Sequence, residues 1–348
     1  MNLITELDIK NFRSIKKLSL ANCKQFNLLI GKNNCGKSTL LESVYASCDI
    51  PNMPLDQINT CRSNVVRTNE DLSVIFHNID VSNPVEITRI NGEQKRKLDI
   101  ECVFGNDSKY ITMTGQLLNE KRISSFKISI DDFSDDFSNK YSVLYNQADW
   151  GLGKVPFTSD EIELIKKDSG RCPVFYWTAQ WNNFNPTTQL ESLIISKKKD
   201  LLLNVLVSVD SSIKDIQLGS NGSIFVDTGL SSLLPLRMVG QGIEKIVGLV
   251  SCIATISNGI ILIDEFENGL HYTAMDGLWK AVAELCERQN NQIFATTHSY
   301  ECIDSFTRIT STENSSIFRI ERNNFEHKST YISNEAARNA ISKRWEIR

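Results

Sequence analysis

Eight consecutive residues near the N-terminus have the types and the spacing of a phosphate-binding loop. They are Gly31, Lys32, Asn33, Asn34, Cys35, Gly36, Lys37 and Ser38, which match the pattern GxxxxGK[ST], and Thr39 follows them. In such a loop the main-chain N–H groups converge on a polyphosphate, the lysine adds a positive charge, and the serine hydroxyl is a ligand for Mg²⁺. We therefore expect this segment to bind the phosphates of a nucleotide, with Ser38 as a magnesium ligand.

Two adjacent carboxylates form a second candidate group. Asp264 and Glu265 directly follow Ile260–Ile263, a short apolar run with the composition of a buried strand. An aspartate at the end of such a strand can hold Mg²⁺, and the next glutamate can orient or deprotonate a water molecule that attacks a phosphate. Together with the loop, the pair predicts hydrolysis of a nucleoside triphosphate. Taken alone, it is equally compatible with a strand that ends in acidic surface residues.

The phosphate-binding loop requires a strand before it and a helix after it. Apolar clusters within residues 3–30 predict three short strands, the last of which ends at Gly31, and a helix is predicted from Lys37 to Cys48. Consecutive strand-like segments then predict an antiparallel sheet. These are Leu72–Phe76, Val85–Ile90, Lys97–Phe104, Tyr110–Thr114 and Ile123–Ile130. The acidic, serine-rich repeat at 131–138 is predicted to be a solvated loop.

The second half of the chain predicts a parallel sheet covered by helices. Apolar strands alternate with helical stretches there, which is typical of parallel sheets. The predicted strands cover 172–177, 260–263 and 292–296, and the predicted helices cover 187–208, 243–256 and 273–288, with an interruption at Lys197-Lys198-Lys199.

The composition is that of a globular protein. The chain has 348 residues, of which 41% are hydrophobic and 23% charged, and 38 Lys and Arg against 42 Asp and Glu give a net charge of −4. No apolar run is long enough for a membrane span and the N-terminus lacks a signal-peptide pattern, so we expect a cytoplasmic protein without membrane contact. The nine cysteines form no CxxC pair and are predicted to be reduced core thiols.

Several motifs resemble those of ABC-type ATPases in the branch of RecF, the structural-maintenance-of-chromosomes (SMC) proteins and the overcoming-lysogenization-defect (OLD) ATPases. Residues 264–271, DEFENGLH, resemble the Walker B motif and D-loop, and residues 294–299, FATTHS, resemble the strand that ends in the switch histidine. The opening NFRSI at 11–15 and the closing EIR at 346–348 are similar too. The resemblance covers nearly the whole chain.

The resemblance implies an α/β P-loop NTPase fold with an ABC-ATPase-like head. Such a head has a mostly parallel central sheet, an antiparallel β subdomain and a helical lobe. Residues 1–348 would form a single head. Its parts would be the P-loop part at 1–70, the antiparallel part at 71–145, the helical lobe with the signature loop at 170–256, and the Walker B and switch part at 257–348.

The resemblance also implies roles for four residues outside the phosphate loop. His298 would contact the γ-phosphate, where an imidazole N–H can donate to an oxygen. Gly240 and Gly242, before a predicted helix, would form the signature loop that completes the site of a second subunit, although the serine of the usual LSGGQ form is missing. A simple helix-capping turn is the alternative there. Gln180 would be the Q-loop glutamine and a magnesium ligand, on the strength of its position alone.

The implied activity is that of an ATPase that uses ATP and Mg²⁺ and closes as a head-to-tail homodimer, or a higher homo-oligomer, around two ATP molecules. The chain resembles compact stand-alone ATPases of bacterial anti-phage defence, which would regulate a separate effector such as a nuclease or toxin.

Three alternatives to this function stay open. The first is a DNA-repair clamp of the RecF type, in which Lys95–Lys97 and Lys197–Lys199 would contact DNA phosphates. The second is the nucleotide-binding subunit of a transporter, which the missing signature serine disfavours. The third is a scaffold that binds ATP without hydrolysing it.

Overall fold

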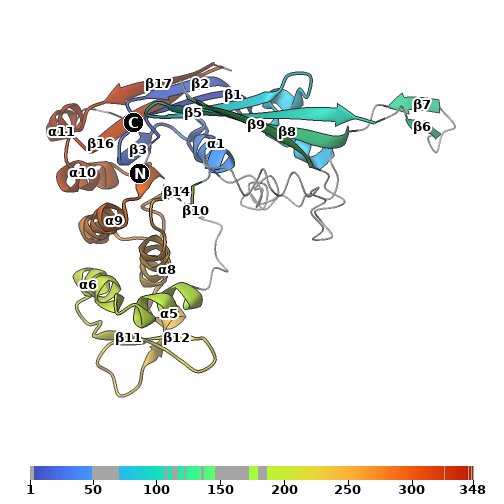
Figure 1. Cartoon of the computed structure of the whole chain (residues 1–348). Coiled ribbons are helices and arrows are strands. Elements are labelled where there is room, and N and C mark those ends of the chain that lie inside the picture. The colour runs from blue at the N-terminus through green and yellow to red at the C-terminus, as the bar shows by residue number, and fades with distance from the viewer. Residues whose placement is uncertain are drawn as a thin grey trace.

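A computed structural model describes residues 4–48, 70–105, 108–111, 117–120, 123–134, 137–145, 172–178, 186–324, 326–343, 345 and 347. Figure 1 shows an antiparallel sheet at the top, a central sheet with helices below it, and a small sheet within residues 215–235 at the bottom. The N-terminal and C-terminal parts of the described chain lie close together beside the central sheet.

The central sheet has six strands in the order β10-β14-β15-β3-β16-β17. The first five run parallel, and β17 is antiparallel to β16. Their carboxyl ends therefore meet at one edge, where α/β proteins bind ligands. The bounds are Val174–Trp177 (β10), Ile260–Ile263 (β14), Gln292–Thr296 (β15), Phe26–Ile30 (β3), Ser315–Asn323 (β16) and Glu326–Ile332 (β17).

The second six-stranded sheet is antiparallel, in the order β2-β1-β4-β5-β8-β9. It includes the first two strands of the chain, because β1 pairs with β4. The bounds are Ile15–Ala21 (β2), Glu6–Phe12 (β1), Val85–Asn91 (β4), Gln94–Phe104 (β5), Ile123–Ser134 (β8) and Phe137–Tyr145 (β9), and a separate ribbon pairs β6 (Ser108–Ile111) with β7 (Leu117–Glu120).

The helix α1 (Lys37–Cys48) lies between the two sheets and contacts β1 and β4 on one side and β10, β14 and β15 on the other. Alternate residues of the central strands point to opposite faces. Leu29 and Leu262 pack toward α1 and the antiparallel sheet, whereas Leu28 and Ile263 pack toward the helices of the other face. Both faces of the central sheet are therefore buried, which explains its continuous apolar strands.

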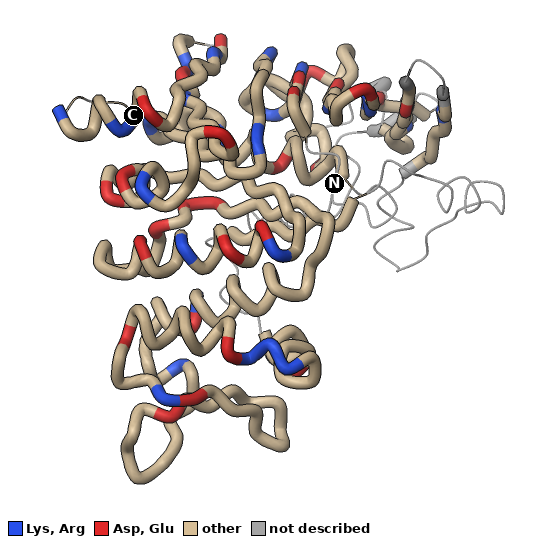
Figure 2. Tube along the Cα trace, turned by 60° about the vertical axis from the view of Figure 1, so that its left-hand side comes forward, with Lys and Arg blue, Asp and Glu red and all other residues tan. Residues whose placement is uncertain are grey.

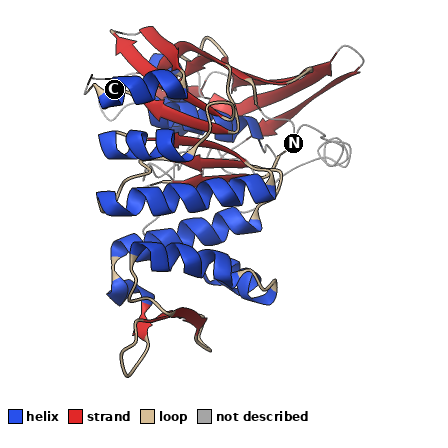
Figure 3. Cartoon of the chain, turned by 90° about the vertical axis from the view of Figure 1, so that its left-hand side faces the viewer, coloured by secondary structure: helices blue, strands red, loops and turns tan. Residues whose placement is uncertain are grey.

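Four helices stack on the other face of the central sheet, one beneath another (Figure 3). They are α11 (Asn334–Ser342), α10 (Tyr300–Ile309), α9 (Met275–Gln289) and α8 (Gln241–Thr255). The lobe continues with α5 (Thr187–Ile195), α6 (Lys199–Val209), α7 (Leu236–Val239) and a small sheet of β11 (Asp215–Leu218), β12 (Ile224–Asp227) and β13 (Leu234–Pro235). Of the helices that the structure describes, none is long and apolar enough to cross a membrane.

The predicted parallel sheet and most of the predicted antiparallel strands are confirmed. The strand predicted at 72–76 is wrong, because residues 70–75 form the 3₁₀ helix η1 (Glu70–Ile75). Leu72 and Ile75 are both buried and three residues apart, which is a helical spacing. In so short an apolar run, this spacing cannot be told from that of a buried strand. Of the strand predicted at 110–114, only the end of β6 lies within the described residues.

The solvated loop predicted at 131–138 is also wrong where the structure describes it, because β8 continues to Ser134 and β9 begins at Phe137. Asp132 is buried there and lies opposite Arg96 in the neighbouring strand. Their ion pair, with a distance of 2.7 Å between Nη1 and Oδ2, compensates the buried carboxylate. The helical stretch predicted at 187–208 divides into α5 and α6 at Lys197, whose φ is +58°.

Candidate functional site

The phosphate-type loop joins β3 to α1 at the carboxyl edge of the central sheet. Gly31 opens it with a φ of +143°, a conformation that favours glycine. A Cβ atom at this position would lie 2.3 Å from the carbonyl oxygen of Ile320 in β16, so a side chain would collide with backbone. The first glycine of the motif is thus required both by its φ angle and by the close approach of β16.

Lys37 folds back over the loop. Its ammonium group donates hydrogen bonds to the carbonyl oxygens of Gly31, at 2.9 Å, and Lys32, at 3.0 Å. The side chain is buried, and burial lowers its pKa, while Cys35 and Asp264 act in the opposite direction. The positive charge is therefore held at the start of α1, beside the main-chain amides of the first helical turn.

Asp264 and Glu265 follow β14 and are positioned by the neighbouring strand β15. The hydroxyl of Thr296 donates to Oδ1 of Asp264 at 2.6 Å, and the same hydroxyl accepts the N–H of Glu265 at 2.8 Å. Glu265 has a φ of +52°, which is strained for a residue with a side chain and is common at functional sites. One threonine thus orients both predicted site residues.

His298 follows β15 and is held by Glu267. The carboxylate of Glu267 accepts hydrogen bonds from the main-chain N–H of His298 at 2.7 Å and from the Thr297 hydroxyl at 2.8 Å. Burial, followed by the charge of Lys37, lowers the pKa of the His298 imidazole. The ring is therefore biased toward the neutral form, which still has one N–H donor.

The loop after Glu265 is fixed from the helical lobe by Lys245 of α8. Its ammonium group donates to the carbonyl oxygens of Asn268 at 2.7 Å, Phe266 at 2.9 Å and Glu265 at 3.3 Å. Burial lowers the pKa of Lys245 to about 8. A single partly buried side chain thus joins α8 to the carboxylate loop.

These groups surround one cavity of about 330 Å³. It brings together most of the residues that the sequence predicted, although they come from three separate parts of the chain. The lining residues are Ser14, Asn33, Asn34, Gly36, Lys37, Ser38, Thr39, Asp264, Glu265, His298 and Arg322. Gly240 and Gly242 are not among them, and Gln180 lies outside the described residues.

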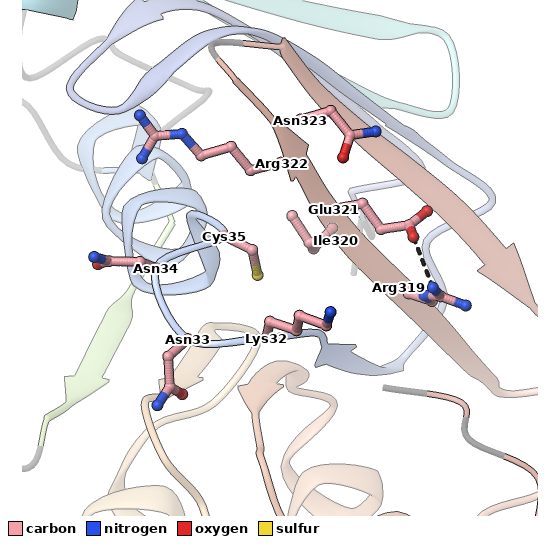
Figure 4. Close-up of a pocket in the computed structure, with 9 residues that line it drawn as sticks. All are labelled: Lys32, Asn33, Asn34, Cys35, Arg319, Ile320, Glu321, Arg322 and Asn323. Atoms are coloured by element: carbon pink, nitrogen blue, oxygen red, sulfur yellow. Dashed lines mark hydrogen bonds and ion pairs between the residues drawn. The ribbon is translucent and has the colours of Figure 1, made fainter.

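A second hollow of about 360 Å³ adjoins the first on the β16 side of the loop (Figure 4). Asn33, Asn34 and Arg322 line both hollows. Lys32 and Cys35 face the second hollow from the loop, and Arg319 and Glu321, joined by an ion pair of 2.7 Å, line it from β16.

The donor set fits a nucleoside triphosphate with Mg²⁺. The cavity combines a lysine ammonium group with the N-terminus of a helix, both of which favour phosphate oxygens. It also holds the Ser38 hydroxyl and the Asp264 carboxylate, and Mg²⁺ typically takes one or two such protein ligands together with phosphate and water. The identity of these ligands remains a prediction.

The predicted signature turn lies at the start of α8. Gly240 has a φ of +138°, and no atom of the described residues lies within 4 Å of the position that a Cβ would take. A Cβ on Gly242 would lie 3.2 Å from the carbonyl oxygen of Gly269, so the turn packs beside the D-loop segment. Gly269 likewise has open space around its Cβ position within the described part of the chain.

Comparison with known proteins identifies the family of the chain. Residues 26–304, which include the phosphate loop, the two carboxylates and His298, match the family described as "AAA domain, putative AbiEii toxin, Type IV TA system". The chain belongs to this AAA-domain family.

Relatives and solved structures agree with this assignment. The "ATP/GTP phosphatase" of Helicobacter pylori is 25% identical over 332 residues, 88% of each chain. RecF of Clostridioides difficile is 24% identical over 213 residues, which are 61% of this chain and 47% of RecF. An Smc head bound to the C-terminal winged-helix domain of ScpA superposes with a TM-score of 0.54 at 11% identity, over 97% of this chain and 99% of that chain. The AAA-domain protein is thus a P-loop ATPase of the ABC type, in the RecF and SMC branch, and the predicted fold class is confirmed.

Sequence reasoning missed several residues of this ATPase's site. Thr296 lies in the FATTHS segment but was given no role there, and Lys245 lies in no motif, since the roles of both come from contacts across the fold. Two further histidines contact segments next to the loop. His327 lies in β17, and its ring would be 3.2 Å from a Cβ on Gly36. His77 is buried, and its Nδ1 lies 3.0 Å from the carbonyl oxygen of Arg13 in the NFRSI segment.

Proposed function

We propose that this ATPase closes as a head-to-tail homodimer around two Mg²⁺·ATP units and that closure regulates a separate effector protein. In each site, Gly31, Asn33–Thr39, Asp264 and His298 of one chain would bind the nucleotide, and Gly240 and Gly242 of the partner would complete it. Glu265 would act as the general base toward the attacking water. Bound Mg²⁺ would supply positive charge at the phosphates.

The observation that carries the proposal is that the two halves of the expected nucleotide site, the phosphate cavity and the signature turn, lie apart within one chain. The phosphate cavity contains a lysine, two carboxylates and a histidine, but the Gly240–Gly242 turn does not line it. That turn instead forms an open surface with Gly269, next to the helix start of α8. A helix N-terminus can bind an anion, and a second copy related by a two-fold axis would bring each turn to the other chain's cavity.

A complementation experiment tests the composite site. Lys37→Ala removes the phosphate contact, and Gln241→Glu puts a negative charge at the exposed signature turn. The second change also puts an acid at a helix N-terminus, which favours folding. Each variant alone should be nearly inactive. In a mixed dimer, one of the two sites combines the intact halves of both chains.

Random mixing makes half of the dimers mixed, each with one good site of two, so the mixture should recover about one quarter of the wild-type rate. Activity that stays at the sum of the separate variants would contradict the composite site. The matched control is a mixture of Lys37→Ala with Lys37→Ala/Gln241→Glu, in which no intact pair can form.

The effector is proposed from the family description, which names a putative toxin of a type IV toxin–antitoxin system, and from the compact head. The test is co-purification of the product of the adjacent gene with the Glu265→Gln variant. Binding in the presence of ATP but not ADP supports regulation through closure, whereas equal binding with both nucleotides contradicts it. A role in anti-phage defence would then be checked by infecting cells that carry the wild-type gene or the Lys37→Ala gene.

The alternative DNA clamp has weaker support, although RecF is among the relatives. The basic triplets proposed for it are largely engaged within the fold. Arg96 is buried against Asp132, Lys97 pairs with Asp99 at 2.9 Å, and Lys199 pairs with Asp215 at 2.7 Å. Figure 2 shows positive and negative residues interspersed along the helices and strands rather than gathered by sign.

A further inference from the structure

Two cysteines far apart in the sequence meet at the end of α1 that is remote from the phosphate loop. Cys48 is the last residue of α1, and Cys172 lies just before β10. The N–H of Cys172 donates to the carbonyl oxygen of Cys48 at 3.3 Å, which fixes the two backbones beside each other. Both thiols are reduced, and a hydrogen bond joins them.

A buried guanidinium group contacts both sulfur atoms. Nη1 of Arg89 in β4 lies 3.2 Å from Sγ of Cys172 and 3.4 Å from Sγ of Cys48. Arg89 is only 1% exposed, and Arg96 of β5, itself paired with Asp132, adds further positive charge nearby. A cation held against a thiol in this way stabilises its thiolate form, which is the reactive nucleophile.

The other cysteines provide an internal contrast. Burial raises the pKa of Cys23, Cys102, Cys252 and Cys302 to about 12, so these groups stay protonated and unreactive. For Cys172, the hydrogen bond from Cys48 and the charges of Arg89 and Arg96 lower the pKa to about 6, although burial opposes them. Cys172 is also partly exposed, while Cys48 is fully buried.

We propose that Cys48 and Cys172 form an oxidation site at which hydrogen peroxide converts the two thiols into a disulfide. The Cys172 thiolate attacks one peroxide oxygen, the O–O bond breaks, and the departing hydroxide takes a proton to become water. The Cys172 sulfenic acid that forms is then attacked by the Cys48 sulfur, which loses its proton. The S–O bond breaks, the S–S bond forms, and the second hydroxide leaves as water with that proton. The dithiol loses two electrons and the peroxide gains them.

The disulfide would tie together the two ends of a long chain segment. Residues 49–171 separate the cysteines, and this segment contributes four strands of the antiparallel sheet, β4, β5, β8 and β9. Oxidation would anchor both ends of the segment to α1. The 12 residues of α1 span about 18 Å, so the link forms at the opposite end of this helix from Lys37 and leaves the phosphate cavity itself unobstructed.

The first test uses the unmodified full-length chain. Reduced protein is alkylated with iodoacetamide at pH 7, and the labelling rate of each cysteine is followed by mass spectrometry. Cys172 should react at least 10-fold faster than Cys252, with a half-maximal rate near pH 6. Equal rates for the two cysteines would overturn the proposal. This measurement does not depend on a variant that might fail to fold.

The second test follows the product. Wild-type protein treated with a small excess of hydrogen peroxide should yield a peptide pair linked through Cys48 and Cys172, which dithiothreitol separates. Cys48→Ser should stop at the sulfenic acid of Cys172, detected by its trapping with dimedone, and Cys172→Ser should yield neither product. Cys252→Ser is the matched control and should behave as wild type. Failure of the linked pair to form in the wild type, or its formation with other cysteines in preference, would overturn the proposal.

Discussion

Gly31 and Gly240 have nearly the same unusual φ angle, +143° and +138°, but opposite surroundings. Gly31 is packed so closely against β16 that a Cβ would lie 2.3 Å from a carbonyl oxygen, while the Cβ position of Gly240 has no described atom within 4 Å. The first glycine belongs to the phosphate cavity, a region that the fold completes by itself and that we call the closed region. The second belongs to the turn at Gly240–Gly242, which the described chain leaves uncovered and which we call the open region.

The difference extends to the side chains around each glycine. Near Gly31, Lys37 is anchored on two carbonyl oxygens, and across the cavity Thr296 and Glu267 fix the residues that follow β14 and β15. Met238, two residues before Gly240, is 74% exposed, and Tyr272, three residues after Gly269, is 64% exposed. One region is preorganised for a ligand, and the other has the character of a surface that a partner covers.

The largest expected effect is on the closed region. Lys37→Ala removes the charge held at the start of α1, and we expect kcat/KM for ATP to fall about 10²- to 10³-fold, as for other lost electrostatic contacts. Lys32→Ala, in the same loop but with an exposed side chain, is the matched control and should stay within about threefold of wild type. A phosphate-release assay measures both. Comparable losses in the two variants would mean that Lys37 contributes no more to catalysis than Lys32 does.

Glu265→Gln separates closure from hydrolysis. The amide keeps the shape of the side chain but cannot accept a proton, so hydrolysis should fall about 10²-fold while nucleotide binding continues. The ATP-bound closed form should then accumulate, and light scattering after gel filtration should give twice the mass of one chain. The double variant Lys37→Ala/Glu265→Gln should remain a monomer under the same conditions. A mass that does not depend on ATP in the single variant would argue against closure of the open region on a partner.

Much of the closed region could be predicted from the sequence, because the residues within each of its motifs are contiguous and their spacing is fixed by backbone geometry. The phosphate loop, the buried strand before Asp264 and the strand before His298 are all local patterns, and the structure brings them to one cavity. The contacts of Thr296 and Lys245 could not be predicted in this way, since each joins segments that become neighbours only in the folded chain.

Errors in the predicted elements have the same origin. The charged residue Asp132 favours a loop when its sequence neighbours are considered alone, but Arg96 in the adjacent strand neutralises it inside the sheet. The nine cysteines looked alike as core thiols in the sequence. Among the cysteines that the structure describes, the approach of Arg89 from β4 distinguishes Cys48 and Cys172.

Lys245 connects the two regions, because it lies in the helix that starts at the open turn and holds the loop that follows Glu265. Lys245→Met keeps the apolar stem but removes three hydrogen bonds to carbonyl oxygens. We expect the Glu265 loop to loosen and kcat to fall about 10-fold, since small misplacements of a catalytic group are costly. Lys280→Met, on the exposed side of α9, is the control. If hydrogen exchange of residues 265–268 and kcat are both unchanged, the two regions are not coupled through this side chain.

The smallest expected effect concerns His298 and the pH dependence of stability. Its pKa is lowered in the folded protein, so between the folded value and the unfolded value of about 6.5 the unfolded chain binds more protons. Stability conferred by the neutral ring is therefore present above about pH 6.5 and is lost as the pH falls toward the folded pKa. His298→Gln cannot titrate and should lose less stability than wild type between pH 7.5 and pH 5. The difference should stay below about 1 kcal/mol because the half-buried ring is partly screened by solvent.

Urea unfolding at the two pH values measures this difference, and His271→Gln is the control because His271 is exposed. Its lost stability should match that of wild type. If His298→Gln loses as much stability on acidification as wild type does, burial and the positive charge of Lys37 do not lower the pKa of the ring. The cavity would then be less tightly organised than its hydrogen bonds indicate, and the contrast with the open turn at Gly240 would be correspondingly weaker.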